Sequence, residues 1–262
     1  MNTCNPIYFM HIAKTAGSYV NKMFVDALGN DACILHAEHV LRHKSHEKGV
    51  VTRAIEEDGV RFFSGHIYYK DWENGFADEG LDFCRITTVR EPISHIASHI
   101  QWLDHYNLPE NKQEYQNLSM PLRELVEQIS QVDFDSFGDL DAFMNGLSGV
   151  GVQMLDNCQS RYFLCGHSSD IHRSDAIDLS SAGKLSESLK MFDAVFTMGQ
   201  IDTAIPMINS MTGVNLKSLG KKVNVAKSQR VIDINNKVVR SILSKRCLVD
   251  QSLWRMVSSR KY

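Results

Sequence analysis

The chain has 262 residues, of which 43% are hydrophobic and 23% are charged, proportions that are ordinary for a soluble globular protein. With 5 Pro, 16 Gly and no low-complexity tract, it is neither collagen-like nor intrinsically disordered. The net charge of −3 conceals a segregation, because residues 214–262 hold twelve Lys and Arg but two acidic residues. That segment carries about +10 and the preceding part about −13.

Cysteine usage and hydropathy predict a cytoplasmic protein. The six cysteines are scattered without CxxC pairs or zinc-finger spacing, so we expect reduced thiols rather than a disulfide framework. The apolar stretch 7–12 is too short for the core of a signal peptide and has no basic segment before it. No segment has the length of about eighteen apolar residues that spans a bilayer.

In chain order, residues 7–12 are β-branched and aromatic and predict a buried strand. Small residues over 13–18 break this pattern, and 19–28 show helical spacing that ends at Gly29. Strand, small-residue loop and helix is the usual beginning of an α/β nucleotide site. Residues 61–66 predict a second strand.

The later elements continue the alternation. Residues 82–89 predict a strand, followed by a helix that starts at Pro92 and runs to residue 106. Residues 121–147 are expected to be mostly helical. The remaining predicted elements are a strand at 194–198 and helices at 201–211, 231–243 and 249–257. No linker divides the chain, so residues 1–262 predict one α/β domain with a central, mainly parallel sheet flanked by helices and a P-loop-like nucleotide site.

The first loop, residues 11–18 (HIAKTAGS), lies where a phosphate-binding loop is expected. A helix that begins near Ser18 offers free N–H groups to an anion, Lys14 adds a charge, and Thr15 and Ser18 add hydroxyls. A Walker A loop requires GxxxxGK[ST], but here the lysine precedes the glycine, so ATP or GTP hydrolysis is not expected. The alternative is an ordinary strand–helix turn with an exposed lysine.

A second motif covers residues 88–99 (TVREPISHIASH). Arg90 ends a predicted strand, and Ser98 follows eight residues later along a predicted helix. An arginine can hold a phosphate through two parallel hydrogen bonds, and a serine on the same helix can add a donor. Taken alone, Arg90 could equally form a salt bridge at the end of the strand.

The first loop resembles the 5′-phosphosulfate loop of sulfotransferases that use 3′-phosphoadenosine 5′-phosphosulfate (PAPS). It is most similar to the HxPKTGGT form of the glycan sulfotransferases of the heparan sulfate 2-O and 6-O type. Lys14, Thr15, Gly17 and Ser18 match that form, whereas Ala13 replaces a proline. Ala16 replaces a glycine of the same motif. The resemblance implies that residues 14–18 bind the 5′-phosphosulfate.

The second motif resembles the 3′-phosphate motif of the same family, xxRDPxxRxxSxY. By this resemblance, Arg90 and Ser98 hold the 3′-phosphate. Glu91, His95 and His99 replace the family's aspartate, second basic residue and aromatic residue. Both motifs occur in this order and about 75 residues apart, which is harder to obtain by chance than either motif alone. Together they favour a PAPS-dependent sulfotransferase.

The predicted reaction is an in-line transfer of the sulfuryl group to an acceptor hydroxyl, with 3′,5′-ADP as the product. His66 follows a predicted strand between the two motifs, and the family resemblance also places the catalytic base there. A structural role is the alternative for His66. Lys14 is expected to stabilise the leaving oxygen, while His11 orients the loop. By the same resemblance, Lys222 and Lys227 belong to a basic loop that closes over the nucleotide.

The acceptor is the open question. The glycan-type loop favours a carbohydrate hydroxyl, with a peptide tyrosine or a small metabolite as alternatives. A phosphotransferase on the same sheet and a non-catalytic nucleotide-binding module also remain open. No nucleic-acid partner, membrane span or metal is expected. His36, His39, His43 and His46 have near-helical spacing, but no carboxylate or cysteine pattern completes a metal site, so we interpret them as a solvated face that can border the acceptor cleft.

Overall fold

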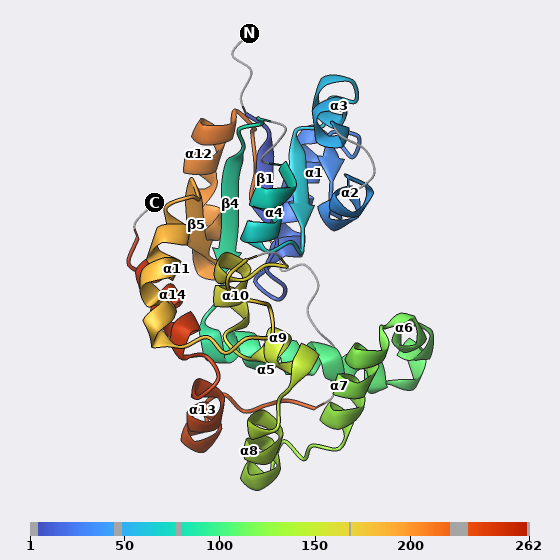
Figure 1. Ribbon diagram of the computed structural model, residues 1–262, viewed down its shortest axis with the longest axis vertical. Coiled ribbons are helices and arrows are strands. Elements are labelled where there is room, and N and C mark those ends of the chain that lie inside the picture. Colours follow the sequence, from blue (N-terminus) through green and yellow to red (C-terminus); the bar gives the residue numbers. More distant parts are fainter. Residues whose placement is uncertain (1–4, 45–48, 77–79, 168, 221–229, 261–262) are drawn as a thin grey trace.

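A computed structural model of the chain describes residues 5–44, 49–76, 80–167, 169–220 and 230–260. Its centre is a five-stranded sheet in which every strand pairing is parallel (Figure 1). The strand order is β2-β3-β1-β4-β5. The strands are β1 (Ile7–Met10), β2 (Cys33–Ile34), β3 (Phe62–Gly65), β4 (Cys84–Val89) and β5 (Ala194–Thr197). The predicted α/β class, with a parallel sheet flanked by helices in a single domain, is confirmed.

Both faces of the sheet are covered, which explains why its strands are continuous apolar runs rather than alternating ones. In β1, Ile7 and Phe9 belong to one apolar cluster, and Tyr8 and Met10 belong to another. Because successive side chains of a strand point to opposite faces, these are the two faces of the sheet. All four residues are fully buried.

Helices from distant parts of the chain supply the two covering layers. The Phe9 face packs against α1 (Gly17–Leu28) and α12 (Ile201–Thr212) through residues such as Phe24 and Ile208. The helices that cover the Tyr8 face are α4 (Tyr69–Phe76), α10 (Cys158–Leu164), α11 (Ala182–Leu189) and α14 (Leu248–Ser258). On that face the ring of Tyr8 stacks on Trp72 of α4 with centroids 3.6 Å apart.

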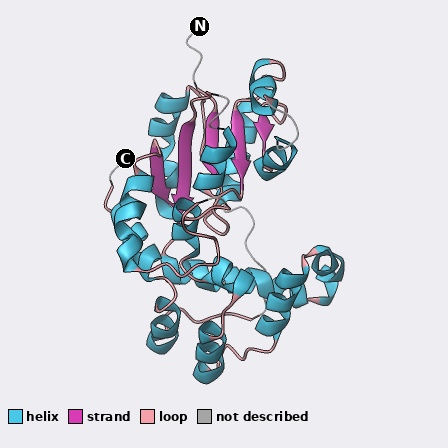
Figure 2. Cartoon of the chain, viewed as in Figure 1, coloured by secondary structure: helices cyan, strands magenta, loops and turns pink. Residues whose placement is uncertain are grey.

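A helical region lies beyond the carboxyl ends of the strands (Figures 1 and 2). Its first helix, α5 (Pro92–Asp104), runs across the end of the sheet. The other members are α6 (Lys112–Asn117), α7 (Met120–Ser130), α8 (Phe137–Asn145), α9 (Gly149–Leu155) and α13 (Lys237–Ser244). They share an apolar cluster that includes Ile100, Ile129 and Leu243. Two further helices, α2 (Ala37–Lys44) and α3 (Val50–Glu56), connect β2 to β3 and lie near the β2 edge of the sheet.

The structure corrects several predicted boundaries. The helix predicted over 231–243 begins at Lys237, because the side chain of Asn236 accepts hydrogen bonds from the N–H groups of Val238 and Val239 and so caps the helix there. The strand predicted over 7–12 ends at Met10. The segment 121–147 is divided into α7 and α8 at a turn, where Ser136 caps α8.

Sequence periodicity also missed several short helices, among them α4 and α10. Each has eight residues or fewer, which is too short for a helical repeat to stand out. Within the described residues, no helix combines the length and the apolar character that crossing a bilayer requires.

Candidate functional site

The connections of the sheet diverge between β1 and β4. The chain that leaves β1 runs to β2 at one side of the sheet, and the chain that leaves β4 runs to β5 at the other edge. In open parallel sheets, ligands bind outside the carboxyl ends of the strands at such a divergence. The two sequence motifs follow these two strands, so the topology brings them to one place.

The loop after β1 reaches α1 through two left-handed residues. Lys14 has a φ of 65° and Ala16 a φ of 71°, values that are uncommon for residues other than glycine. No side chain caps α1, and the N–H of Tyr19 makes the first turn's bond by donating to the Ala16 carbonyl at 2.9 Å. Within the described residues, the N–H groups of Gly17 and Ser18 are thus left for an anion at the positive end of the helix dipole.

Gly17 is required by the close approach of His11. A Cβ at position 17 would lie 1.9 Å from Cδ2 of the His11 ring, far inside van der Waals contact. Burial lowers the pKa of His11 to about 3, with smaller contributions from His66, His36 and Lys14, so its ring is neutral. His11 therefore supports the loop as an uncharged aromatic ring, as its predicted orienting role requires.

The side chain of Thr15 is buried and anchors the loop to β4. Its hydroxyl donates to the carbonyl of Ile12 at 2.8 Å and lies 2.9 Å from the hydroxyl of Thr88. Thr88 also donates to the carbonyl of Thr15 at 3.0 Å. With its hydroxyl used in this way, Thr15 offers a ligand its backbone N–H rather than the side-chain donor expected from the sequence.

Arg90 connects the second motif to the first. Its Nη1 donates to the carbonyl of Lys14 at 3.3 Å, and its Nε donates to the hydroxyl of Ser94 at 3.0 Å. Most of the guanidinium donors remain for an anion. Ser98 lies one helical turn beyond Ser94 on the same side of α5 and is partly exposed, and Arg90 directly precedes the N-cap residue of this helix.

Lys14 and Arg90 are half-buried cations that form no salt bridge among the described residues, although the charge of Glu91 partly offsets the effect of burial on the pKa of Arg90. The nearest acid in sequence, Glu91, instead accepts from the N–H of Ser94 and lies 3.5 Å from Nη2 of Arg240. Burial lowers the pKa of both cations, and the charge of Arg90 lowers that of Lys14 further. Such a pair is destabilised in the free protein, and a bound polyanion would relieve the repulsion.

His66 lies directly after β3, next to the loop. Its Nδ1 is 2.7 Å from the carbonyl of His11, and the two imidazole rings are 4.2 Å apart. Because a carbonyl can accept but not donate, Nδ1 carries the proton and Nε2 is the basic nitrogen. Desolvation lowers the pKa of His66 despite opposing contributions from the His11 carbonyl and Glu38, so the exposed ring is neutral at pH 7.

The rim of this region comes from α2. The Oε2 atom of Glu38 accepts from the N–H of His66 at 3.3 Å, and its Oε1 lies 3.2 Å from Nδ1 of His36. His36 and His39 are exposed, with ring centroids 6.1 Å apart, and His36 shares the Glu38 carboxylate with the backbone of His66. The side chains of His43 and His46 lie outside what the structure describes.

Two buried histidines support the loop from beneath. Nε2 of His95 donates to the carbonyl of Ala13 at 2.8 Å, while both ring nitrogens of His99 are buried without a partner among the described residues. These rings and Cys158 place potential ligand atoms within 4.8 Å of one another. However, the charges of Arg90 and Lys14 add to burial in lowering the pKa of His95 to about 4, and the same charges disfavour a divalent cation. This environment favours neutral imidazoles that carry the loop.

The expected cover of the site is only partly described. Lys222 and Lys227 lie outside the described residues. Arg230, at the end of the same basic segment, points into the protein: its Nε donates to Asp104 at 3.1 Å and its Nη1 to the Val132 carbonyl at 2.7 Å. Arg230 is therefore part of an internal ion pair in this structure.

Sequence reasoning missed Gln159, which contacts the backbone of Arg90. Oε1 of Gln159 accepts from the N–H of Arg90 at 2.7 Å, and its Nε2 donates to the Arg90 carbonyl at 3.0 Å. No local pattern of residue types indicates this contact, because Gln159 and Arg90 are 69 positions apart in the sequence. In comparisons with known proteins, no family model matches the chain and no curated protein matches it significantly.

Proposed function

We propose that this chain is a PAPS-dependent sulfotransferase that transfers the sulfuryl group to an acceptor hydroxyl on a carbohydrate. The observation that carries the proposal is the hydrogen bond from Arg90 to the carbonyl of Lys14, which joins the two sequence motifs. An anion at the start of α1 and a second phosphate at Arg90 would lie on the same ligand. PAPS carries both groups, whereas ATP lacks the 3′-phosphate.

The arrangement suits in-line sulfuryl transfer. Nε2 of His66 takes the proton of the acceptor hydroxyl as its oxygen forms a bond to sulfur. The bond between sulfur and the bridging phosphate oxygen breaks, and the negative charge passes to 3′,5′-ADP. Lys14 and the N–H groups at the start of α1 stabilise that charge. Transfer depends on positioning and electrostatics in the way described for phosphoryl transfer.

The acceptor class rests on the resemblance of the loop to the glycan-type sulfotransferases. The exposed His36, which contacts the same Glu38 carboxylate as the backbone of His66, indicates a polar surface next to the proposed base. A peptide tyrosine and a small metabolite remain the alternative acceptors within the same reaction. The proposed site therefore identifies the sulfuryl donor more narrowly than it identifies the class of acceptor.

Two measurements test the proposal. Isothermal titration with 3′,5′-ADP, 5′-AMP and ATP should give the tightest binding for 3′,5′-ADP, because Arg90 and Ser98 contact the 3′-phosphate. Incubation with sulfur-labelled PAPS and a panel of glycans, tyrosine peptides and small phenols should then move label to a glycan.

Each outcome has a separate meaning. Preference for ATP would favour a phosphotransferase and overturn the sulfotransferase proposal. Tight 3′,5′-ADP binding without transfer to any member of the panel would favour a non-catalytic nucleotide-binding module. Transfer to a peptide or phenol would keep the reaction and change the acceptor class.

A further inference from the structure

We infer that Gln159 is a positioning residue for Arg90, held in place by two helices that cap each other. This inference rests on the proposed function and extends it to a residue that touches no ligand. Gln159 is almost fully buried, and both ends of its amide bind the backbone of Arg90. Arg90 is the first residue after β4, where the ladder of the sheet no longer supplies partners for its N–H and carbonyl.

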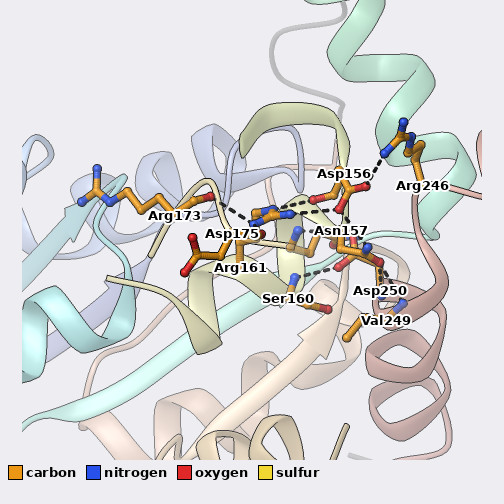
Figure 3. Close-up of polar contacts among 10 residues, drawn as sticks. Asp156, Asn157, Ser160, Arg161, Arg173, Asp175, Arg246, Val249 and Asp250 are labelled. Atoms are coloured by element: carbon orange, nitrogen blue, oxygen red, sulfur yellow. Dashed lines mark hydrogen bonds and ion pairs between the residues drawn. The ribbon is translucent and has the colours of Figure 1, made fainter. Parts of the chain in front are cut away.

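The backbone of Gln159 is itself held by α14. The carboxylate of Asp250 accepts from the N–H of Gln159 at 3.2 Å and from the N–H of Ser160 at 2.7 Å. In return, Oδ1 of Asn157 accepts from the N–H groups of Val249 and Asp250 at 2.8 and 3.2 Å (Figure 3). Each helix thus supplies the side chain that caps the other's first turn.

A second set of contacts fixes the start of α10. The buried guanidinium of Arg161 donates to the carbonyls of Asp156, Arg173 and Asp175 at 2.7 to 3.0 Å (Figure 3). The Asp156 carboxylate lies 2.9 Å from Nη2 of Arg161 and 3.2 Å from Nη1 of Arg246. Buried networks of this kind hold one geometry because any displacement leaves several polar groups unsatisfied.

The consequence is a rigid support for the 3′-phosphate site. The direction of the Arg90 side chain follows from its backbone, and Gln159 holds both polar groups of that backbone from one side. Ser94 holds Nε from the other side. A guanidinium that is already oriented loses less entropy when it binds a phosphate. Gln159 should therefore matter for binding the 3′-phosphate and not for the rest of the nucleotide.

The test compares Gln159→Leu with the wild-type protein by titration with 3′,5′-ADP and with 5′-AMP, which lacks the 3′-phosphate. Loss of the two hydrogen bonds should weaken 3′,5′-ADP binding by about tenfold and leave 5′-AMP binding unchanged. Gln153→Leu is the matched control. Gln153 lies on α9 and donates to the hydroxyl of Ser174 at an exposed position, so this variant should change neither affinity. Gln159→Met, which is closer in length, is the second variant if Gln159→Leu does not fold.

The outcomes separate this inference from the proposed function. If the wild-type protein shows no preference for 3′,5′-ADP over 5′-AMP, the proposed function fails and this inference fails with it. If the wild-type protein shows the preference and both Gln159 variants retain it, only the positioning role is wrong. Equal weakening of both nucleotides would also overturn it, because that result indicates a general loss of structure.

Discussion

Lys14, Arg90 and His66 follow three neighbouring strands, and their environments set two different charge states. Lys14 and Arg90 are cations that form no salt bridge among the described residues, whereas His66 is mainly neutral with its proton on Nδ1. Two cations beside a neutral imidazole suit a reaction in which an anion leaves and a hydroxyl is deprotonated. The roles of these residues can be separated by single substitutions.

His66→Ala should lower kcat by at least about 100-fold, because the acceptor hydroxyl loses its base. The affinity for 3′,5′-ADP should stay the same, since His66 faces the acceptor in the proposed arrangement. Lys14→Ala should lower both kcat and nucleotide affinity. Turnover with labelled PAPS and titration with 3′,5′-ADP measure these effects, and Lys22→Ala at an exposed position of α1 is the control. Near-wild-type turnover in His66→Ala would show that the base lies elsewhere.

The pH dependence of kcat/KM should report the neutral state of His66. Desolvation lowers its pKa from the ordinary value of 6.5, so the base form predominates at pH 7 and is lost as pH falls through the lowered value. Activity should therefore rise with pH and reach its plateau with a midpoint below 6.5. Initial rates at subsaturating acceptor between pH 4.5 and 8.5 give this midpoint. A midpoint above 6.5 is incompatible with His66 in this environment.

At the scale of elements, the site depends on how two helices begin. α1 starts without a side-chain cap after a left-handed Ala16, which leaves its first N–H groups for a ligand. α5 starts with Pro92 and is capped by Glu91, whose side chain accepts from the N–H of Ser94. The uncapped N-terminus of α1 can bind an anion, whereas the capped N-terminus of α5 fixes the backbone next to Arg90.

Gly17→Ala should damage the open helix start. The new methyl group would overlap the His11 ring, and displacing that ring costs about 1–3 kcal/mol of folding stability. Because His11 also accepts from His66, the nucleotide affinity and kcat should fall together. Urea unfolding and 3′,5′-ADP titration measure both effects. Gly183→Ala in α11, where the space around the Cβ is open, should leave affinity unchanged; equal behaviour of the two variants would contradict this account.

At the scale of the whole molecule, the charge segregation of the sequence is partly neutralised by folding. Basic residues of the C-terminal segment form ion pairs with acidic residues from α5 to α9 and the connections beside them. The pairs are Arg230–Asp104, Arg240–Glu91, Lys245–Asp141 and Arg246–Asp156. Among the described residues of this segment, four of the basic side chains are therefore paired with acids, and these pairs connect α13 and its flanking residues to the helical region.

Arg230→Ala should destabilise the fold without weakening nucleotide binding. Asp104 is buried, so removing Arg230 takes a charged hydrogen-bond partner from its carboxylate, at a cost of about 1–3 kcal/mol of folding stability. Lys245→Ala is the control, because its pair with Asp141 is exposed and should change stability by less than about 1 kcal/mol. Urea unfolding gives the stability. A stable Arg230→Ala protein with weakened 3′,5′-ADP binding would instead place Arg230 in the cover of the nucleotide.

The sequence by itself determined the features that depend on neighbouring residues. Apolar runs predicted four of the five strands, since a strand buried on both faces must be apolar throughout. The small-residue loop before α1 and the proline after Arg90 predicted where two helices begin, because those residue types set local backbone geometry. Lys14, Arg90 and His66 stand out in the sequence because they lie in or between two motifs that resemble those of sulfotransferases, and because the chemistry of a side chain can be read one residue at a time.

Only the tertiary structure decided which of these residues meet and what holds them. The hydrogen bond of His66 to His11 and the exchange of caps between Asn157 and Asp250 join residues 55 to 93 positions apart. No local pattern encodes such pairs, because they arise when the parallel strands align and α10 packs on α14. The same packing turned the hydroxyl of Thr15 inward and left Lys14 and Arg90 without a salt bridge among the described residues. Long-range contacts set these environments because burial and neighbouring charges, not residue type alone, determine which groups remain free to bind or react.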